Sequence, residues 1–310
     1  MGRGPAWRHA TMRELPRNRI VSQGEGYAVH ECARHRDTPP LSSRPFEPIA
    51  LRVVIVTSGL FRYRTPSRQA LLTPGAMVIG EAMRIRDLEP VDGDAGTMLA
   101  FDYSKRLAAS VQASMGPGMS ASRSLHDGLD AEAGVACLPA SKRTVRAFVL
   151  ATQLAGDSAG DSAGKMPAAD ADSIAIAVLD TALTAAAEAS SAERVAPELE
   201  MRIARALRHV ERHHADDCSL DALAQEAGLG VFHFLRSFKR CVGQTPCQHV
   251  MAVRLREAAE FLATSSARVI DIAIDSGFGD LSHFNASFRE AFGVQPSAYR
   301  KRYRTERMTA

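Results

Sequence analysis

The last hundred residues contain one unit twice, and this duplication constrains the fold more than any other feature of the sequence. The first copy covers residues 220–246 and the second covers residues 269–296. Matching residues include the pairs Gly228/Gly277, His233/His283, Phe234/Phe284 and Phe238/Phe288. The offset is 49 before the turn and 50 after it, so the slip falls where an insertion is best tolerated.

Each copy has the pattern of a helix-turn-helix. A short helix with a small alanine at its core position ends at a glycine, Gly228 or Gly277, which supplies the left-handed backbone of a sharp turn. An apolar residue then fills the corner. The second helix places phenylalanines at positions i and i+4 toward the core, and such a helix can enter the major groove of DNA.

The segment between the copies predicts a connecting helix. Threonine caps a helix start and proline suits the first turn, so Thr245-Pro246 marks its beginning. An ordinary all-α bundle with an internal duplication is the alternative. The composition favours the DNA-binding interpretation, because residues 201–310 hold 16 Lys/Arg against 12 Asp/Glu, a net charge of +4. A basic segment admits a nucleic-acid partner without establishing one.

Residues 198–304 resemble the DNA-binding domain of the AraC/XylS family of bacterial transcription regulators. The resemblance rests on the first unit, on the connecting sequence RLREAAEFL and above all on GFGDLSHFNASFREAFGVQPSAYR. It implies an all-α domain that binds double-stranded DNA through two recognition helices in successive major grooves, about 34 Å apart. Activation through RNA polymerase is the family's usual mode, and repression by occlusion is the alternative.

The helix face opposite each phenylalanine pair is the predicted reading face. Its residues are Val231, Phe232, Leu235, Arg236 and Lys239 in the first unit, and Leu281, Ser282, Asn285 and Arg289 in the second. Arginine can bond guanine twice, asparagine can pair with adenine, and lysine suits a phosphate. The face departs from the family pattern, since Leu235, Leu281 and Ala286 stand where polar readers are common. We therefore expect the second unit to read DNA shape or thymine methyl groups.

Residues 27–103 have the composition of short β-strands. LRVVIVTSGLFRYR predicts two strands around a turn at Ser58-Gly59, and ALLTPGAMVIGEAM predicts a strand interrupted at Pro74-Gly75. Close spacing of such strands favours a small barrel or sandwich. The piece GLFRYRTPSRQALLTPGAMVIGE resembles the cupin-like sensor domain of many AraC/XylS regulators.

The expected fold is therefore α+β with two domains, a cupin-like β-barrel with accessory helices and an all-α domain with two helix-turn-helix units. We divide the chain into a basic arm (1–20), a sensor or dimerisation domain (21–150), a flexible linker with an Ala-rich helix (151–197) and the DNA-binding domain (198–305). One helix is predicted after Ser141. Another covers residues 172–189, and its stripe of Ile174, Val178 and Leu179 either forms a homodimer contact or packs within the chain.

The front half offers candidates for ligand binding but not for catalysis. Arg52, Arg62, Tyr63 and Arg64 lie on predicted strands and could hold a small anionic effector, with outward-facing cations as the alternative. A cupin enzyme would need a histidine-rich metal site. No histidine lies between His35 and His126, so we expect no metal, no other cofactor and no enzyme activity.

The cysteines and the apolar runs bear on the compartment. Five scattered cysteines favour a reducing cytoplasm, and Cys32 and Cys137 are either a redox pair or buried thiols. No apolar run approaches the length of a membrane span, so we expect no membrane partner. The alternative function is a metal-free ligand-binding protein with a vestigial DNA domain, which would lack sequence-selective, salt-dependent DNA binding.

Overall fold

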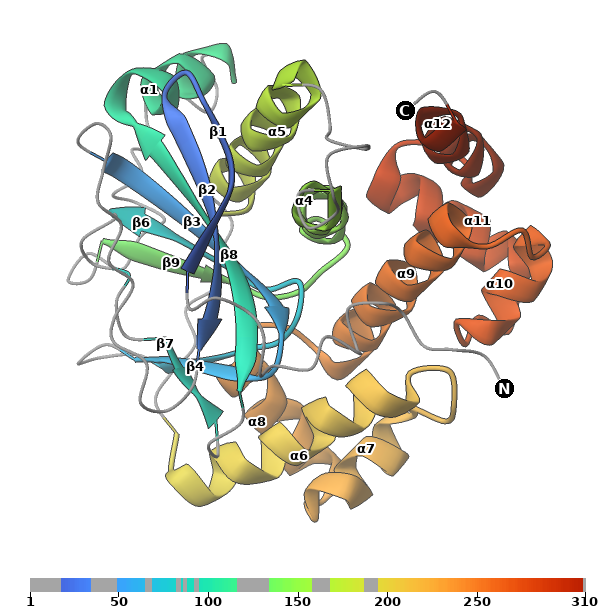
Figure 1. The fold of residues 1–310 in the computed structure, drawn as a ribbon. Helices are drawn as coiled ribbons and strands as arrows, with labels where there is room; N and C mark the ends of the chain where they lie inside the picture. Colours follow the sequence, from blue (N-terminus) through green and yellow to red (C-terminus); the bar gives the residue numbers. More distant parts are fainter. Residues whose placement is uncertain are drawn as a thin grey trace.

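A computed structural model of the chain describes residues 18–34, 49–64, 69–81, 85, 88–91, 95–115, 134–157, 168–186 and 195–308. These residues form a sheet-rich N-terminal part and a helical C-terminal part that contact each other directly (Figure 1). Among the described residues, no helix combines the length and apolarity that crossing a membrane requires.

The N-terminal part contains two antiparallel sheets. The large sheet has the strand order β1-β2-β8-β3-β6-β9 and the small sheet has the order β5-β4-β7. The strands are β1 (Asn18–Gly24), β2 (Tyr27–Arg34), β3 (Ile49–Ser58), β4 (Phe61–Arg64), β5 (Gln69–Leu72), β6 (Met77–Glu81), β7 (Leu88–Pro90), β8 (Gly96–Ser104) and β9 (Val135–Leu138). No closed barrel is found in the described part of the chain, so the cupin-like barrel stays an expectation.

Strand β3 shows why the sheets are layered as they are. Side chains alternate between the two faces of a strand, and both faces of β3 carry buried apolar side chains. Val53 and Ile55 lie in one core with helices, whereas Val54 and Val56 lie in a second core with residues of the small sheet. The helices on the first face are α1 (Lys105–Ser114), α4 (Val145–Asp157) and α5 (Ala168–Ala186), as Figure 1 shows.

The predicted strand breaks are confirmed. Gly59 adopts a φ of +81°, and β3 and β4 lie on either side of it. The turn carries the chain from the large sheet into the small one, because the two strands belong to different sheets. Pro74-Gly75 likewise separates β5 from β6.

Two strands and one helix start differ from the sequence prediction. Strand β1 was not predicted, and it includes the last residues assigned to the basic arm; residues 1–17 lie outside the described part. Strand β9 was also missed, because four residues among turn-forming neighbours give little periodicity. Helix α4 begins at Val145, after a turn in which the Ser141 N–H donates to Thr144 Oγ1 over 2.9 Å, so Ser141 is not its N-cap.

The Ala-rich helix is real, and its apolar stripe packs within the chain. Ile174, Val178 and Leu179 of α5 are buried in the core against the large sheet. This is the intramolecular alternative of the two that the sequence left open. The flanking segments 158–167 and 187–194, which were predicted to be flexible, lie outside the described residues.

The C-terminal part is helical throughout, as predicted. Its helices are α6 (Pro197–His213), α7 (Leu220–Ala227), α8 (Val231–Val242), α9 (Pro246–Thr264), α10 (Val269–Asp275), α11 (Leu281–Phe292) and α12 (Pro296–Met308). Helix α9 starts with the predicted cap, in which Thr245 Oγ1 accepts from the Gln248 N–H and Gln248 Oε1 accepts from the Thr245 N–H.

The cysteines do not form a redox pair. Cys32 on β2 and Cys137 on β9 have three strands between them in the large sheet. At about 4.8 Å per strand step this separation exceeds the reach of a disulfide. Neither cysteine forms a disulfide, and burial raises the pKa of Cys32 to about 12.

Candidate nucleic-acid interface

The first helix-turn-helix unit consists of α7 and α8. Ser219 caps the start of α7, where its Oγ accepts from the Ala222 N–H, and Gly228 caps the end of the helix with a φ of +64°. The Arg202 guanidinium of α6 donates to the Gly228 carbonyl over 2.6 Å. The left-handed glycine and this bond hold the angle between α7 and α8.

The second unit consists of α10 and α11, and its turn is held more tightly. Gly277 has a φ of +88°, and a Cβ there would lie 2.7 Å from the His214 carbonyl oxygen. Arg254 Nε of α9 donates to that same oxygen over 2.7 Å. Any side chain at position 277 would therefore disturb the contact between the second unit and the end of α6.

The phenylalanine pairs face the core in both units, as predicted. Phe234 and Phe238 are fully buried, with ring centroids 5.6 Å apart. Phe284 and Phe288 are also fully buried, with centroids 5.5 Å apart. The two recognition helices, α8 and α11, are thus fixed to their units by the same side chains at the same positions.

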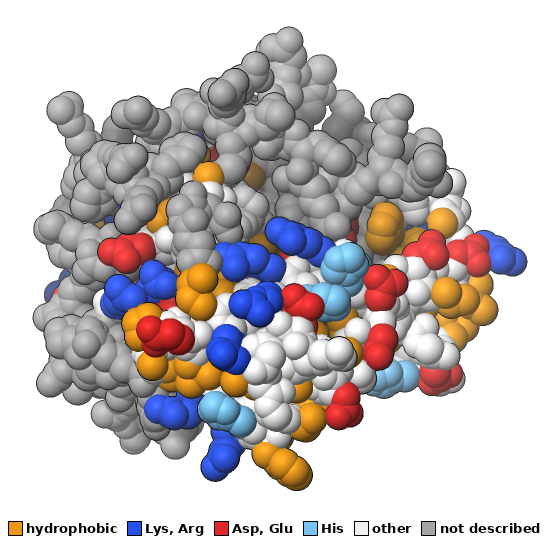
Figure 2. Space-filling view, turned by 90° about the horizontal axis from the view of Figure 1, so that it is seen from below, with side chains coloured by type: hydrophobic (Ala, Val, Ile, Leu, Met, Phe, Trp, Pro, Cys, Tyr) orange, Lys and Arg blue, Asp and Glu red, His pale blue; other side chains and the backbone are white. Residues whose placement is uncertain are grey.

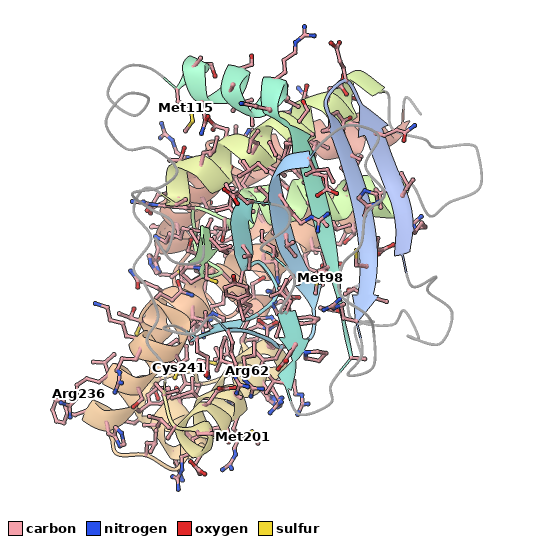
Figure 3. All side chains as sticks on the ribbon, turned by 90° about the vertical axis from the view of Figure 1, so that its left-hand side faces the viewer. Arg62, Met98, Met115, Met201, Arg236 and Cys241 are labelled. Atoms are coloured by element: carbon pink, nitrogen blue, oxygen red, sulfur yellow. The ribbon has the colours of Figure 1, made fainter. Side chains whose placement is uncertain are left out.

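The predicted reading residues lie on the opposite, solvent-facing side of the two helices. On α8, Phe232 is 83% exposed and Arg236 and Lys239 are exposed, while Val231 and Leu235 are half-buried. Figure 3 shows Arg236 at the edge of the molecule, directed away from it. On α11 the exposed members are Leu281, Ser282 and Arg289, and Asn285 is half-buried. Ala286 is exposed as well.

The two recognition helices begin differently. Helix α8 starts at Gly230 without a side-chain cap. Helix α11 starts at Asp280, whose carboxylate accepts from the backbone N–H groups of Ser282 and His283, and these bonds lower the pKa of Asp280. A carboxylate therefore stands at the start of α11 and none at the start of α8, so α8 is the more favourable of the two for approaching phosphates.

Basic side chains gather around the first unit. Figure 2 shows the molecule from below, where α6, α7 and α8 lie, and Lys and Arg side chains are spread over the left half and centre of this surface, with Asp and Glu side chains between them. The contributing residues are Arg202, Arg205, Arg208 and Arg212 on α6, and Arg236, Lys239 and Arg240 on α8. Exposed Lys and Arg side chains are the usual partners of the phosphate backbone of DNA.

The histidines of this region act as packing and pairing residues. His209 lies 3.7 Å from Glu226 and His213 lies 3.3 Å from Asp216, whereas His283 packs edge-on against Phe278. Within the described ranges, no group of three His, Cys, Asp or Glu side chains could hold a metal ion.

The four candidate effector residues do not come together at one site. Arg52 is buried on β3 and makes two hydrogen bonds to Asp102, of 2.6 and 2.9 Å. His30 lies 3.6 Å from the same carboxylate, and burial lowers its pKa. Side-chain alternation places these three groups on the face of the large sheet that looks toward the small sheet.

The other three candidates lie on β4 and point in two directions. Tyr63 is buried in the core between the two sheets. Arg62 points the opposite way and forms an ion pair with Glu200 of α6, and Arg64 is exposed. The sequence predicted that all four residues lie on strands. It could not predict which face of its strand each side chain occupies, because that depends on the element packed against each face.

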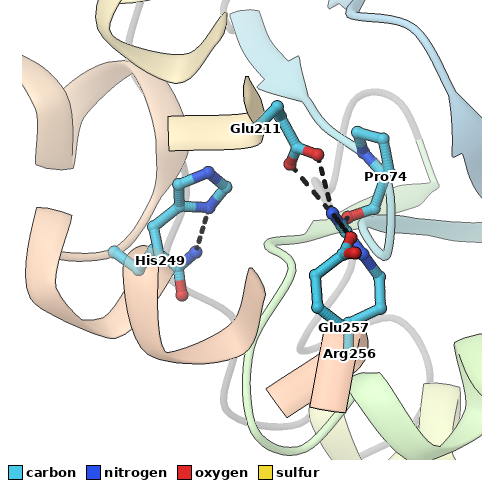
Figure 4. A network of polar contacts seen from close by, with 6 residues as sticks. Pro74, Glu211, His249, Arg256 and Glu257 are labelled. Carbon is cyan, nitrogen blue, oxygen red and sulfur yellow. Dashed lines mark hydrogen bonds and ion pairs between the residues drawn. The ribbon is translucent and has the colours of Figure 1, made fainter. Parts of the chain in front are cut away.

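Sequence reasoning missed a buried polar cluster on α9. Arg256 is 2% exposed and donates to Glu211 of α6 over 2.7 Å and to the Pro74 carbonyl over 2.8 Å (Figure 4). Burial alone lowers the pKa of Arg256, but the carboxylates of Glu211 and Glu257 outweigh it and raise the pKa. An Arg-Glu pair in a helix is normally solvent-exposed, so the sequence held no signal of this burial.

His249 was missed for the same reason. It is fully buried on α9 beside Phe238, and Gln244 Nε2 lies 3.3 Å from its Nδ1. Burial, assisted by the nearby Arg256 charge, lowers the pKa of His249 to about 3. The imidazole is therefore neutral in the folded protein at physiological pH.

Comparison with known proteins finds similarity over part of the chain. A family model described as "Helix-turn-helix domain" matches residues 223–302. The "HTH-type transcriptional activator RhaS" of Escherichia coli is 36% identical over 92 residues, which are 30% of this chain and 33% of that protein. The "MmsAB operon regulatory protein" of Pseudomonas aeruginosa is 31% identical over 96 residues, 31% of each chain. The chain thus spans about a third of the length of these curated relatives.

Two solved structures are similar to about a third of the chain. One is the DNA-binding domain of AdpA, a global transcriptional factor, in complex with a target DNA; it is 29% identical, with a TM-score of 0.32 over 37% of this chain and 100% of that one. The other is the C-terminal domain of AraT, a response regulator from Geobacillus stearothermophilus, which is 24% identical, with a TM-score of 0.32 over 35% of this chain and 88% of that one. The duplicated unit, the two buried phenylalanine pairs and the sequence matches agree, and the C-terminal part of this chain therefore belongs to the helix-turn-helix domains of the AraC/XylS family.

Proposed function

We propose that the protein is a sequence-specific transcription regulator that binds double-stranded DNA through α8 and α11. The observation that carries the proposal is the repeated geometry of the two units. Each buries its phenylalanine pair and leaves the opposite face of its second helix open to solvent. Two such helices joined by α9 suit two successive major grooves on one face of DNA.

The two helices contribute differently in this proposal. Arg236 of α8 is exposed and can bond a guanine twice, while Lys239 of the same face contacts a phosphate. On α11, Ser282 reaches a phosphate or a base edge and Asn285 is the candidate adenine reader. The exposed Leu281 supplies an apolar contact to thymine methyl groups. Helix α8 therefore provides most of the polar base recognition.

We further propose that the protein activates transcription, with RNA polymerase as its partner and the cytoplasm as its location. The support is the relative RhaS, which bears the name of a transcriptional activator. Homodimerisation stays a prediction, and the apolar stripe of α5 is not free to mediate it, because that stripe is already buried within the chain.

A small effector in the sheet-rich part completes the proposal. The groups best placed for it are His30, Arg52 and Asp102, which share the face of the large sheet that looks toward the small sheet. Because Asp102 already neutralises Arg52, this cluster favours a neutral, hydrogen-bonding effector over the anionic one expected from the sequence.

The decisive experiment is to select bound duplexes from a random DNA pool with the full chain, and to titrate the best duplex and a scrambled one at several salt concentrations. A regulator binds the selected duplex at least about a thousandfold more tightly than the scrambled one, with affinity falling as salt rises. Equal affinity for both duplexes would favour the alternative, a ligand-binding protein whose DNA domain is vestigial.

A further inference from the structure

The small sheet separates two hydrophobic cores. Strand β4 directs Phe61 and Tyr63 into the core between the two sheets, and β5 directs Ala70 and Leu72 into the same core. The residues between them point the other way, because side chains alternate along a strand. The small sheet is therefore a single layer of strands. Its inner face packs against the interior of the sensor part, and its outer face is covered by another part of the chain.

The first helix-turn-helix unit covers that outer face. Leu71 of β5, together with Leu60 just before β4 and Val91 just after β7, belongs to the same buried cluster as the core residues of α6, α7 and α8. All three side chains are at most 5% exposed. Helix α8 contacts β5 directly. The core of the first unit is thus completed by residues of the sensor part.

A buried ion pair crosses the same boundary. Arg62 of β4 stands opposite Leu71 in the sheet register and binds the carboxylate of Glu200 in the first turn of α6. Glu200 is fully buried, and this arginine provides the compensating charge for its carboxylate. Figure 3 labels Arg62 of β4 and Cys241 of α8, which both lie in the lower part of that view, where the small sheet and the first unit are drawn.

The segment that follows β5 reaches the connecting helix. The Pro74 carbonyl, two residues after the end of β5, accepts a 2.8 Å hydrogen bond from Arg256 of α9. The same guanidinium lies over the ring of Phe148 of α4, 5.5 Å from its centroid. A displacement of β4 and β5 would therefore act on α6 through Arg62, on α8 through Leu71 and on α9 through Pro74.

From this geometry we propose that the small sheet β5-β4-β7 is the element that couples the interior of the sensor part to the first helix-turn-helix unit, with Arg62–Glu200 as its latch. A ligand that presses on Phe61, Tyr63 or Leu72 from inside shifts the strands that hold α6 and α8 from outside. The docked arrangement leaves the reading residues of α8 exposed, so it is the DNA-competent state, and loosening the sheet weakens specific binding. The regulatory meaning of this coupling rests on the proposed function, but the coupling itself is testable without DNA.

The test is hydrogen exchange of the full chain in the absence of DNA. Leu72→Ala removes a side chain from the inner face of the small sheet, and Met98→Ala removes one of similar size from the same core, on β8 of the large sheet. We expect Leu72→Ala to speed exchange of the α6–α8 amides by about tenfold or more, and Met98→Ala to change it by less than about twofold. If an alanine variant does not fold, Leu72→Val and Met98→Leu replace the pair.

The latch is tested by repeating Leu72→Ala in an Arg62→Gln/Glu200→Gln background, in which no buried charge is left unpaired. The effect of Leu72→Ala on α6–α8 exchange should shrink by about threefold or more, because one of its routes is gone. Equal acceleration by Leu72→Ala and Met98→Ala would overturn the coupling, and an unchanged effect in the double-glutamine background would overturn the latch. Failure of DNA binding would alter neither result, so it would count only against the proposed function.

Discussion

Replacing Arg256 with alanine should destabilise the whole chain and not only the DNA-binding part. Arg256 is 3% exposed in its side chain and bonds Glu211 and the Pro74 carbonyl, with Glu257 3.4 Å away. Removing one partner of a buried ion pair costs about 3–5 kcal/mol, because the remaining charge is left without compensation. Losing the donor to Pro74 places the expected loss in the upper part of that range.

Urea unfolding at pH 7, followed by circular dichroism, measures this loss. The double variant Arg256→Met/Glu257→Gln should lose less stability than Arg256→Ala, since the glutamine at position 257 carries no charge. Glu211 is 18% exposed, so its carboxylate can reach water. Arg268→Ala is the matched control, because its ion pair with Asp271 is exposed and should not contribute measurably. A loss below about 1 kcal/mol for Arg256→Ala would refute the reasoning, since that is the range of a surface pair.

Three further predictions concern DNA recognition, pH and modularity. On the selected duplex, Arg236→Ala should cost about 1–3 kcal/mol of binding free energy and relax selectivity at one base position, whereas Lys239→Ala should weaken binding to all duplexes alike and lower the salt slope by about one counterion. Asn285→Ala should cost less binding free energy than Arg236→Ala. A greater cost for Asn285→Ala would show that α11 is the main reading helix. The pKa of His249 is about 3 in the folded protein and about 6.5 when unfolded, so its contribution to stability is complete above pH 6.5 and is lost as the pH drops toward 3, with about 2 kcal/mol lost at pH 5. His249→Gln should flatten this pH dependence. An unchanged pH dependence in urea titrations would contradict the conclusion that His249 is buried in its neutral form. A fragment of residues 197–310 should be helical and bind DNA by circular dichroism and gel shift, but it should unfold at lower temperature than the same region of the full chain, because Leu60, Leu71 and Val91 no longer complete its first core.

The sequence determined the local architecture of the DNA-binding part. Glycine at the helix ends, the Thr245-Pro246 start and the phenylalanine pairs at helical spacing act within a few residues, so a single copy of the unit contains the signals that shape it. The duplication repeats the glycines and the phenylalanine pairs in the second unit. The same locality located the turns at Ser58-Gly59 and Pro74-Gly75, and it left the short strand β9 unrecognised.

The tertiary structure alone decided which charged residues serve which role. Arg52, Arg62 and Arg64 look equivalent in the sequence, yet the first pairs with Asp102 within the sheet-rich part, the second pairs with Glu200 of the helical part, and the third is exposed. The physical reason is distance along the chain. The contacts Arg62–Glu200 and Arg256–Pro74 join residues 138 and 182 positions apart, and no periodicity or local propensity encodes a partner at that separation. Which residues pack against each face of the small sheet was therefore decided only by the packing of the two parts of the chain against each other.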